Sequence, residues 1–137
     1  MYEDHSGKID SLLEKAYTAL AESKCLHDNG FTSGTVSRAY TACYHSAVAA
    51  LLSRDMDIIK PSAMAVCFDR ELVRGGYIEK RYQQLFAGAH RHKQVADIDE
   101  ETAPSPAEAV ASLEAASEFV QRVEKYLRDY GFVRSQG

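Results

Sequence analysis

The sequence predicts an all-α fold, a bundle of four or five helices that run mostly up and down. Apolar residues recur at spacings of three and four along most of the chain, and no strand-like alternation persists beyond a few residues. Turn signals at Asn29-Gly30, Arg74–Gly76 and Ser105-Pro106 divide the chain into segments of helix length. With 137 residues, 45% of them apolar, the chain predicts one domain over 1–137, with a core of about 6–130 and a loose tail at 131–137.

A first helix is expected from about Ser6 to Asn29, where Asn-Gly is a strong stop signal. The link over 30–32 is so short that this helix and the next must be antiparallel neighbours. The predicted inward stripe is Ile9, Leu12, Leu13, Ala16 and Leu20, and the predicted solvent face carries Glu14, Lys15, Glu22 and Lys24.

The central helix is expected from Ser33 to Arg54, with Thr32 or Ser33 as its cap. It is apolar or small almost all round, which predicts burial on two sides. The second side therefore needs a partner, either another helix of this chain or a second subunit. One side carries Val36, Tyr40, Cys43, Ala47, Ala50 and Leu51, and the other carries Arg38, Ala42, His45, Ala49 and Leu52.

The rest of the chain predicts three further helices separated by proline and glycine signals. The last of them begins with a capping box that has proline at the first helical position. The expected elements are a short helix at Ser62–Val73, a fourth helix from Tyr77 to about Ala96, a loop at Asp97–Pro104 and a final helix from Ser105 to about Tyr130 with Val110, Leu113, Ala116, Val120, Val123 and Leu127 inward.

Arg38 and His45 are seven residues apart on the central helix, so they lie within roughly 20° of each other and about 10.5 Å apart along its axis. A permanently charged guanidinium and a group that titrates near neutrality could serve phosphodiester chemistry, one holding phosphate and one moving protons. The alternative is structural: Arg38 pairs with a carboxylate, and His45 is a satisfied interface histidine. Both interpretations remain open on these residues alone.

Residues His90, Arg91, His92 and Lys93 form the one concentrated basic patch of the sequence. Histidines two residues apart do not share a helical face, so no metal site is predicted there. The patch is either a set of cations favoured at a helix C-terminus or a rim that binds phosphate.

The composition limits the class of protein. The formal charge is −4, so any RNA contact must depend on a local patch, and DNA binding is not expected. The three cysteines are widely spaced and indicate neither a disulfide framework nor a zinc site. No cofactor motif is present, and no apolar run approaches 18 residues, so we expect a cytoplasmic protein without a membrane span.

The ordered set of motifs resembles the HEPN domain (higher eukaryotes and prokaryotes nucleotide-binding), in its small stand-alone prokaryotic branch. The resemblance spans about residues 8 to 128. It depends on the central stretch SRAYTACYHSAVAALL, on the turn Val73-Arg74-Gly75-Gly76, and on the pattern of Ala115 to Leu127 in the last helix.

This resemblance implies a helical bundle that dimerises through the Arg38/His45 side of the central helix. It also implies a metal-independent endoribonuclease, because many HEPN domains carry an Arg-x(4–6)-His motif that Arg38 and His45 match at its long limit. Small HEPN proteins are often paired with a minimal nucleotidyltransferase as toxin and antitoxin, which makes that enzyme the expected partner. The candidate catalytic residues are Arg38 and His45, and the candidate substrate-binding residues are Tyr40, Arg91 and Lys93.

The chain also departs from the family pattern at several positions. Active members tend to have a polar residue directly after the motif arginine, where this chain has Ala39. The tyrosine that some toxins carry two residues past the histidine, a modification point, is replaced by Ala47. Further departures are Thr41 for a second tyrosine, Lys93 and Ile98 in the Arg-x-x-Ala-Asp-Tyr element, and the missing histidine at Lys60-Pro61-Ser62.

Three functions therefore stay open. The first is a toxin-like ribonuclease dimer, and the second is a non-catalytic HEPN module that binds nucleotide or a partner nucleotidyltransferase. The third is a purely structural bundle. The sequence leaves open which RNA would be cut and whether Tyr40 or Tyr44 is modified.

Overall fold

A computed structural model describes residues 5–57, 60–98 and 103–133, and these residues form a bundle of five α-helices without a strand, as predicted. Short turns extend α3 on both sides, a 3-10 turn (Pro61–Ala63) before it and a π-helical turn (Asp69–Val73) after it. The helices are α1 (Ser6–Asp28), α2 (Thr32–Leu52), α3 (Met64–Phe68), α4 (Lys80–Ile98) and α5 (Pro106–Asp129).

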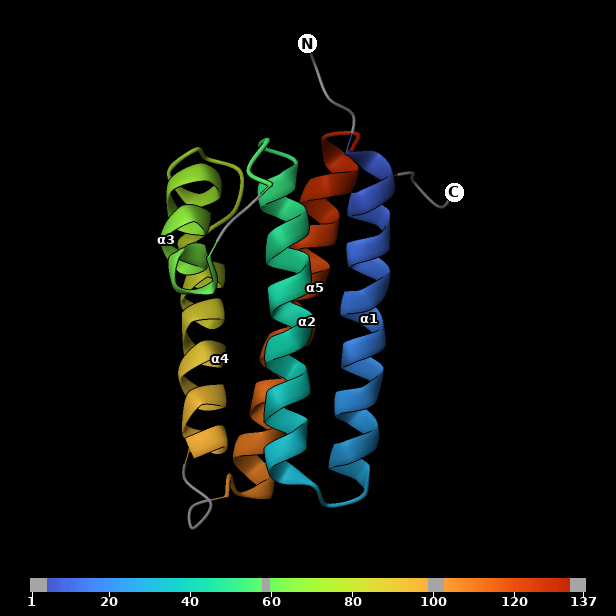
Figure 1. Cartoon of the computed structure of the whole chain (residues 1–137), viewed down its shortest axis with the longest axis vertical. Coiled ribbons are helices and arrows are strands. Elements are labelled where there is room, and N and C mark those ends of the chain that lie inside the picture. The colour runs from blue at the N-terminus through green and yellow to red at the C-terminus, as the bar shows by residue number, and fades with distance from the viewer. Residues whose placement is uncertain (1–4, 58–59, 99–102, 134–137) are drawn as a thin grey trace.

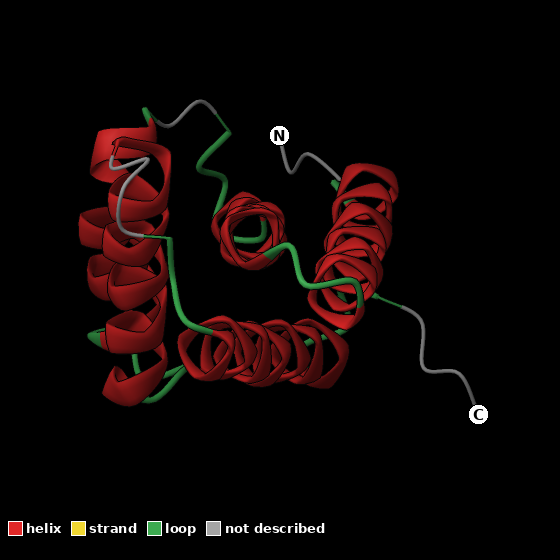
Figure 2. Ribbon diagram, turned by 90° about the horizontal axis from the view of Figure 1, so that it is seen from below, coloured by secondary structure: helices red, strands yellow, loops and turns green. Residues whose placement is uncertain are grey.

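Helix α2 is the centre of the bundle. It packs against α1, α4 and α5, while α3 lies beside one end of α2 and α4 (Figure 1). Seen along its axis, α2 has a helix on three sides and an open fourth side (Figure 2). Beyond its first residue, Thr32, the positions of α2 that are not buried mark this open side and its two margins: Ser33, Gly34, Ser37, Arg38, Thr41, Tyr44, His45 and Val48.

Small residues let α1 and α5 approach α2 closely. Ala42 of α2 is fully buried in a cluster with Ala16 and Ala19 of α1 and Val120 of α5. Ala49 and Leu52, the other apolar residues of the second side of α2, are also buried. The partner that this side requires is therefore the chain's own α1 and α5. Its burial no longer argues for a second subunit, and the dimer itself stays a prediction.

The antiparallel pairing of α1 and α2 is fixed by a tight turn. Gly30 has φ of +81°, a left-handed conformation that glycine adopts at little cost. Beyond the turn, the buried Ser23 hydroxyl donates a hydrogen bond of 2.7 Å to the Thr35 carbonyl, which ties the two helices together. The predicted cap at Thr32 or Ser33 is wrong, because Phe31 precedes the helix and no side chain caps it.

The main core is aromatic and lies between α3, α4 and α5. Phe68, Phe86 and Phe119 stack with ring centroids 5.3–6.4 Å apart, and Tyr126 shares a buried hydrogen bond with Ser53. The predicted stripe of the last helix omits Phe119 and Tyr126. Both are buried because α5 packs against α1, α2 and α4, which requires a wider apolar arc than one stripe.

The connection between α3 and α4 differs from the prediction. The turn at Val73–Gly76 is present, with Gly76 at φ of +84°, and a Cβ at Gly75 would lie 2.5 Å from the Glu71 carbonyl oxygen. Helix α4 then begins at Lys80, three residues later than expected, and runs to Ile98, so Asp97 and Ile98 are helical. Residues 99–102 of the predicted loop lie outside the described residues.

The last helix begins with the predicted capping box, in which Ser105 and Glu108 exchange side-chain and backbone hydrogen bonds. It ends one residue earlier than predicted, at Asp129. Phe132 and Val133, predicted to belong to a loose tail, pack against the core, and 134–137 lie outside the described residues. No helix in the described parts of the chain has the length and apolarity that a membrane crossing needs.

Candidate functional site

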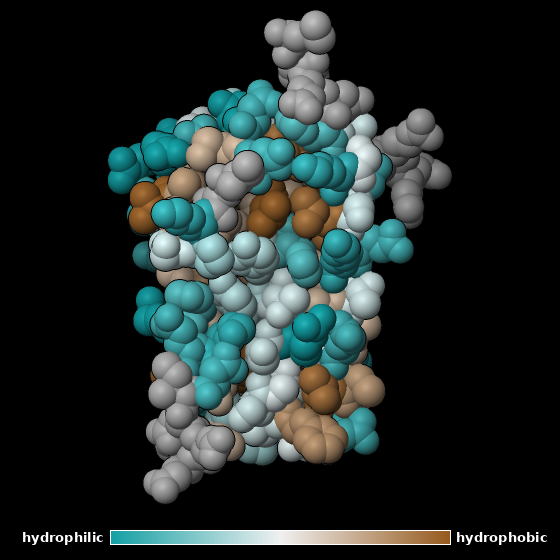
Figure 3. Space-filling view, in the orientation of Figure 1, coloured by the Kyte–Doolittle hydropathy of each residue, from teal (hydrophilic) through white to brown (hydrophobic). Residues whose placement is uncertain are grey.

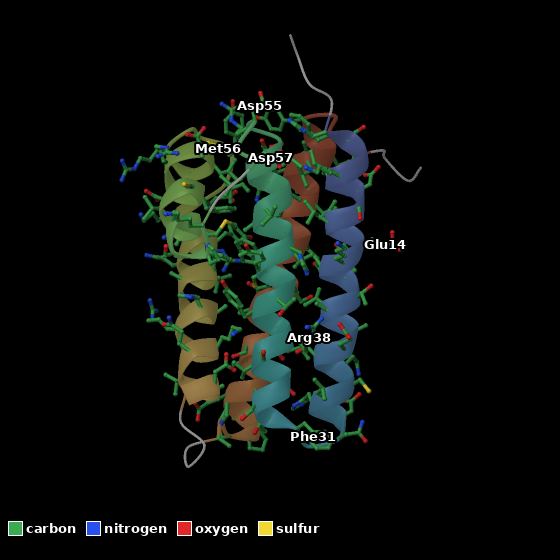
Figure 4. The ribbon with its side chains drawn as sticks, viewed as in Figure 1. Glu14, Phe31, Arg38, Asp55, Met56 and Asp57 are labelled. Carbon is green, nitrogen blue, oxygen red and sulfur yellow. The ribbon has the colours of Figure 1, made fainter. Side chains whose placement is uncertain are left out.

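Arg38 and His45 line one pocket of about 310 Å³ in the groove between α1 and α2. Arg38 lies in this groove, at the margin of the open side of α2 (Figure 4). Helix α1 supplies the opposite wall with Ser11, Glu14, Lys15, Thr18 and Glu22. Arg38 and His45 are seven residues apart, about two helical turns, and this spacing places both side chains in the same cavity.

The Arg38 guanidinium is held by α1. Its Nη2 donates to Glu22 Oε1 over 2.6 Å, and both side chains stay partly exposed. Its Nε is buried and has no hydrogen-bond partner among the described residues. The predicted carboxylate partner therefore exists, yet the contact leaves one edge of the guanidinium unsatisfied, which is costly for a buried donor.

His45 is half-buried and makes no hydrogen bond or ion pair with a described residue. The Tyr44 ring lies edge-on to the imidazole, with 6.2 Å between the two ring centroids. Burial lowers the pKa of His45 below its ordinary value, and the positive charges of Lys15 and Arg38 lower it further. The imidazole is therefore neutral near pH 7 and has a free nitrogen that can accept a proton.

Lys15 and Glu22 are functional candidates that the sequence analysis placed only on the solvent face of the first helix. They are exposed, as predicted, but they also face the pocket. Lys15 makes no ion pair with a described residue, so a cation without a partner borders the cavity. A signal was present in the sequence: Ser11, Lys15, Thr18 and Glu22 follow each other at spacings of four, three and four, which is one helical stripe.

The predicted substrate-binding residues lie on the other margin of α2. Tyr40 faces α4, and its ring centroid is 5.4 Å from that of His90 and 5.8 Å from Lys93 Nζ. Tyr40, His90 and Arg91 line a second pocket of about 180 Å³. The five predicted site residues therefore form two groups, Arg38 with His45 on the α1 side and Tyr40, Arg91 and Lys93 on the α4 side.

The basic patch is not at a helix end. Because α4 continues to Ile98, His90–Lys93 lie inside the helix and not in its last turn. The interpretation of these residues as cations favoured at a helix C-terminus is therefore wrong. Lys93 pairs with Asp97 one turn further on, whereas Arg91 makes no ion pair with a described residue. Among the residues that the structure describes, no three histidine, cysteine or acidic side chains gather into a metal-binding group.

The comparisons with known proteins give three relatives of similar length. The chain is 31% identical over 127 residues to a protein named "Putative toxin MJ0605" from Methanocaldococcus jannaschii, covering 93% of this chain and 94% of the relative. It is 26% identical to "Putative toxin MJ0142" of the same organism, covering 88% of this chain and 82% of the relative. A "UPF0332 protein" from Thermotoga maritima is 24% identical, with 88% of this chain and 92% of the relative covered. No protein-family model matches the chain.

Proposed function

The chain belongs to the family of the toxin-named relative from Methanocaldococcus jannaschii that it matches over nearly its whole length, and on this premise we propose that it is a toxin-like, metal-independent endoribonuclease of the HEPN type. The observation that carries the proposal is the shared pocket of Arg38 and His45. The resemblance of the central motif to HEPN domains adds the reaction class.

The two side chains have complementary roles in cleaving RNA. Neutral His45 accepts the proton of the ribose 2′-hydroxyl as its oxygen attacks the adjacent phosphorus. Arg38 stabilises the negative charge that develops on the phosphate oxygens. The bond to the 5′ oxygen breaks, and water protonates that oxygen, which leaves a 2′,3′-cyclic phosphate and a 5′-hydroxyl end.

Helix α1 sets the resting state of this site. Glu22 occupies one edge of the Arg38 guanidinium, so an incoming phosphate must compete with a carboxylate. Both partners are partly exposed, and such pairs contribute only about 0–1 kcal/mol, so the phosphate can displace Glu22 at little cost. Lys15 adds a second positive charge that an anionic substrate would meet.

The protein is expected to act as a dimer, with the second subunit on the open side of α2. In the orientation of Figure 1, the surface over the middle of α2 has intermediate hydropathy with hydrophilic residues on both sides, and hydrophobic residues lie near its upper end (Figure 3). A subunit docked there would leave the Arg38/His45 pocket at the edge of the interface. Light scattering on the purified protein tests this expectation, as a pull-down of a co-expressed minimal nucleotidyltransferase tests the expected partner.

A non-catalytic module that binds nucleotide or that nucleotidyltransferase is the second candidate. The ion pair of Arg38 with Glu22 favours it, because a structural arginine would be held in this way. Ala39, buried where active HEPN members tend to have a polar residue, points in the same direction.

Induced expression in a bacterial host separates the two candidates. If the protein is a toxic ribonuclease, the wild type arrests growth, while Arg38→Ala and His45→Ala do not, although both variants accumulate as folded protein. Lys24→Ala is a matched control, because Lys24 is a cation of α1 outside the pocket that pairs with Asp28. Growth arrest by all variants, or by none, would contradict the proposal.

A further inference from the structure

The second pocket, between α2, α4 and the turn before α3, has the features of a binding site for an aromatic ring. Its floor contains Tyr40 and Phe86, which are 8% and 2% exposed, and its rim contains Pro61, His90 and Arg91. The Tyr40 hydroxyl makes no hydrogen bond with a described residue. An aromatic floor with an unused hydroxyl offers both ring contacts and a donor to a planar polar ring.

The rim of this pocket is positively charged. Arg91 lines the pocket, is exposed and makes no ion pair with a described residue. Lys93 does not line the pocket and pairs with Asp97, although its Nζ lies 5.8 Å from the Tyr40 ring centroid. His90 lies against the same ring on the α4 side. An aromatic floor beside the Arg91 guanidinium matches a base that stacks while a neighbouring phosphate stays at the positively charged rim.

The size of the pocket limits what can enter. At about 180 Å³ it is smaller than the roughly 300–1,000 Å³ of pockets that enclose drug-sized ligands. It can therefore take one base but cannot enclose a whole nucleotide, so the sugar and phosphate must remain outside. A base attached to a longer strand fits this requirement.

The two pockets lie on opposite margins of the same open side of α2. Arg38 and His45 border one margin and Tyr40 borders the other, and the partly exposed Ser37 and Thr41 lie between them. The distance across is about the width of one helix, roughly 10–12 Å with its side chains. A short single strand is long enough to reach both pockets across Ser37 and Thr41, so the inference requires that a second subunit on α2 leave these two residues uncovered.

We propose that the Tyr40/His90/Arg91 pocket binds one nucleobase of the single-stranded RNA whose backbone is held at Arg38 and His45. The inference rests on the proposed function, which identifies the bound strand as RNA. It adds that recognition uses an unpaired base, so a strand whose bases are all paired in a duplex is not a substrate.

The test uses calorimetry with a short single-stranded RNA that carries 2′-O-methyl groups, so that it cannot be cleaved by its own 2′-hydroxyls. Binding to the wild type is measured for this strand and for versions in which each base in turn is replaced by an abasic site. One abasic position should weaken binding at least about fivefold, which corresponds to the loss of one stacked base. Equal binding of every abasic strand would overturn the proposal.

Variants then locate the base. Tyr40→Phe keeps the ring and should keep the sensitivity to the abasic site, whereas Tyr40→Leu should lose it. Arg91→Ala removes the rim charge and should weaken binding of the intact and the abasic strands by a similar factor. Arg81→Ala is the matched control, because Arg81 is an exposed arginine of the same helix that pairs with Glu118 outside the pocket. If Tyr40→Leu does not fold, the abasic series on the wild type and the Arg91→Ala comparison still decide.

Cleavage of the unmodified strand is measured in parallel. Binding that is sensitive to an abasic site, without cleavage, would contradict the ribonuclease activity and support the base pocket. Cleavage that depends on His45, together with equal binding of every abasic strand, would contradict the base pocket and support the ribonuclease activity.

Discussion

The guanidinium of Arg38 on α2 donates a hydrogen bond of 2.6 Å to the carboxylate of Glu22 on α1, and this contact closes one end of the candidate site. The pair joins residues 16 positions apart across the α1–α2 turn. It places the charge of Arg38 in the pocket, and it also makes Glu22 a competitor for any phosphate that binds there.

Removing the charge of Glu22 should therefore increase the affinity for RNA. In Glu22→Gln, Arg38 no longer faces a carboxylate, and we expect severalfold tighter binding of an uncleavable single strand, measured by calorimetry. The free energy of unfolding should change by less than about 1 kcal/mol, because both side chains are partly exposed.

The control for this change is Glu118→Gln, which removes the same charge from the exposed pair with Arg81. If Glu22→Gln binds RNA no better than Glu118→Gln, Glu22 does not compete with the substrate.

The pH dependence of cleavage should report His45. As a general base it must be neutral, and its pKa is lowered by burial and by Lys15 and Arg38, so the activity should fall only when the pH drops below the ordinary histidine value of about 6.5. Lys15→Gln removes one of the lowering charges, so the acid limb of the profile should move to higher pH. An NMR titration of the His45 ring checks the same shift without catalysis.

Lys24→Gln, on the same helix but paired with Asp28, should leave the limb in place. The lowered pKa of His45 also makes the free energy of unfolding depend on pH. Because the folded-state pKa of His45 is lowered, the unfolded state binds more protons in the window below about pH 6.5, and stability decreases as the pH falls through it. An acid limb that stays fixed in Lys15→Gln would contradict the role of Lys15.

The aromatic core should dominate stability. Phe119 is fully buried between Phe68 and Phe86, so Phe119→Ala should lower the free energy of unfolding by about 3–5 kcal/mol. Val66→Ala, at an exposed position of α3, should change it by less than about 0.5 kcal/mol. Denaturant titration of both variants measures the difference, and similar losses in the two would show that this cluster is not the core.

Helix periodicity was sufficient to predict most of the fold. The stripes of the first two helices, the Gly30 turn and the Ser105–Glu108 capping box follow from local spacing and local backbone chemistry. The start of α4 and the burial of Phe119 depend on how helices pack against one another. A stripe read along one helix does not contain that information.

The candidate site shows the same division. The seven-residue spacing predicted that Arg38 and His45 share a face, but Lys15 and Glu22 come from another helix, and their place in the pocket depends on the register of α1 against α2. The same spacing predicted that Tyr40, two residues from Arg38 and about 200° around the helix, lies on the other side. That rotation places Tyr40 against α4, with the basic patch and away from His45.

The most direct test of the central claim is the incubation of purified protein with mixed-sequence single-stranded RNA in EDTA, beside His45→Ala and Arg38→Ala. EDTA removes metal-dependent contaminants, and the variants control for metal-independent ones. The account predicts that the wild type cleaves the RNA to fragments with cyclic phosphate ends and that both variants leave it intact. Intact RNA with the wild type, or equal cleavage by all three proteins, would contradict it.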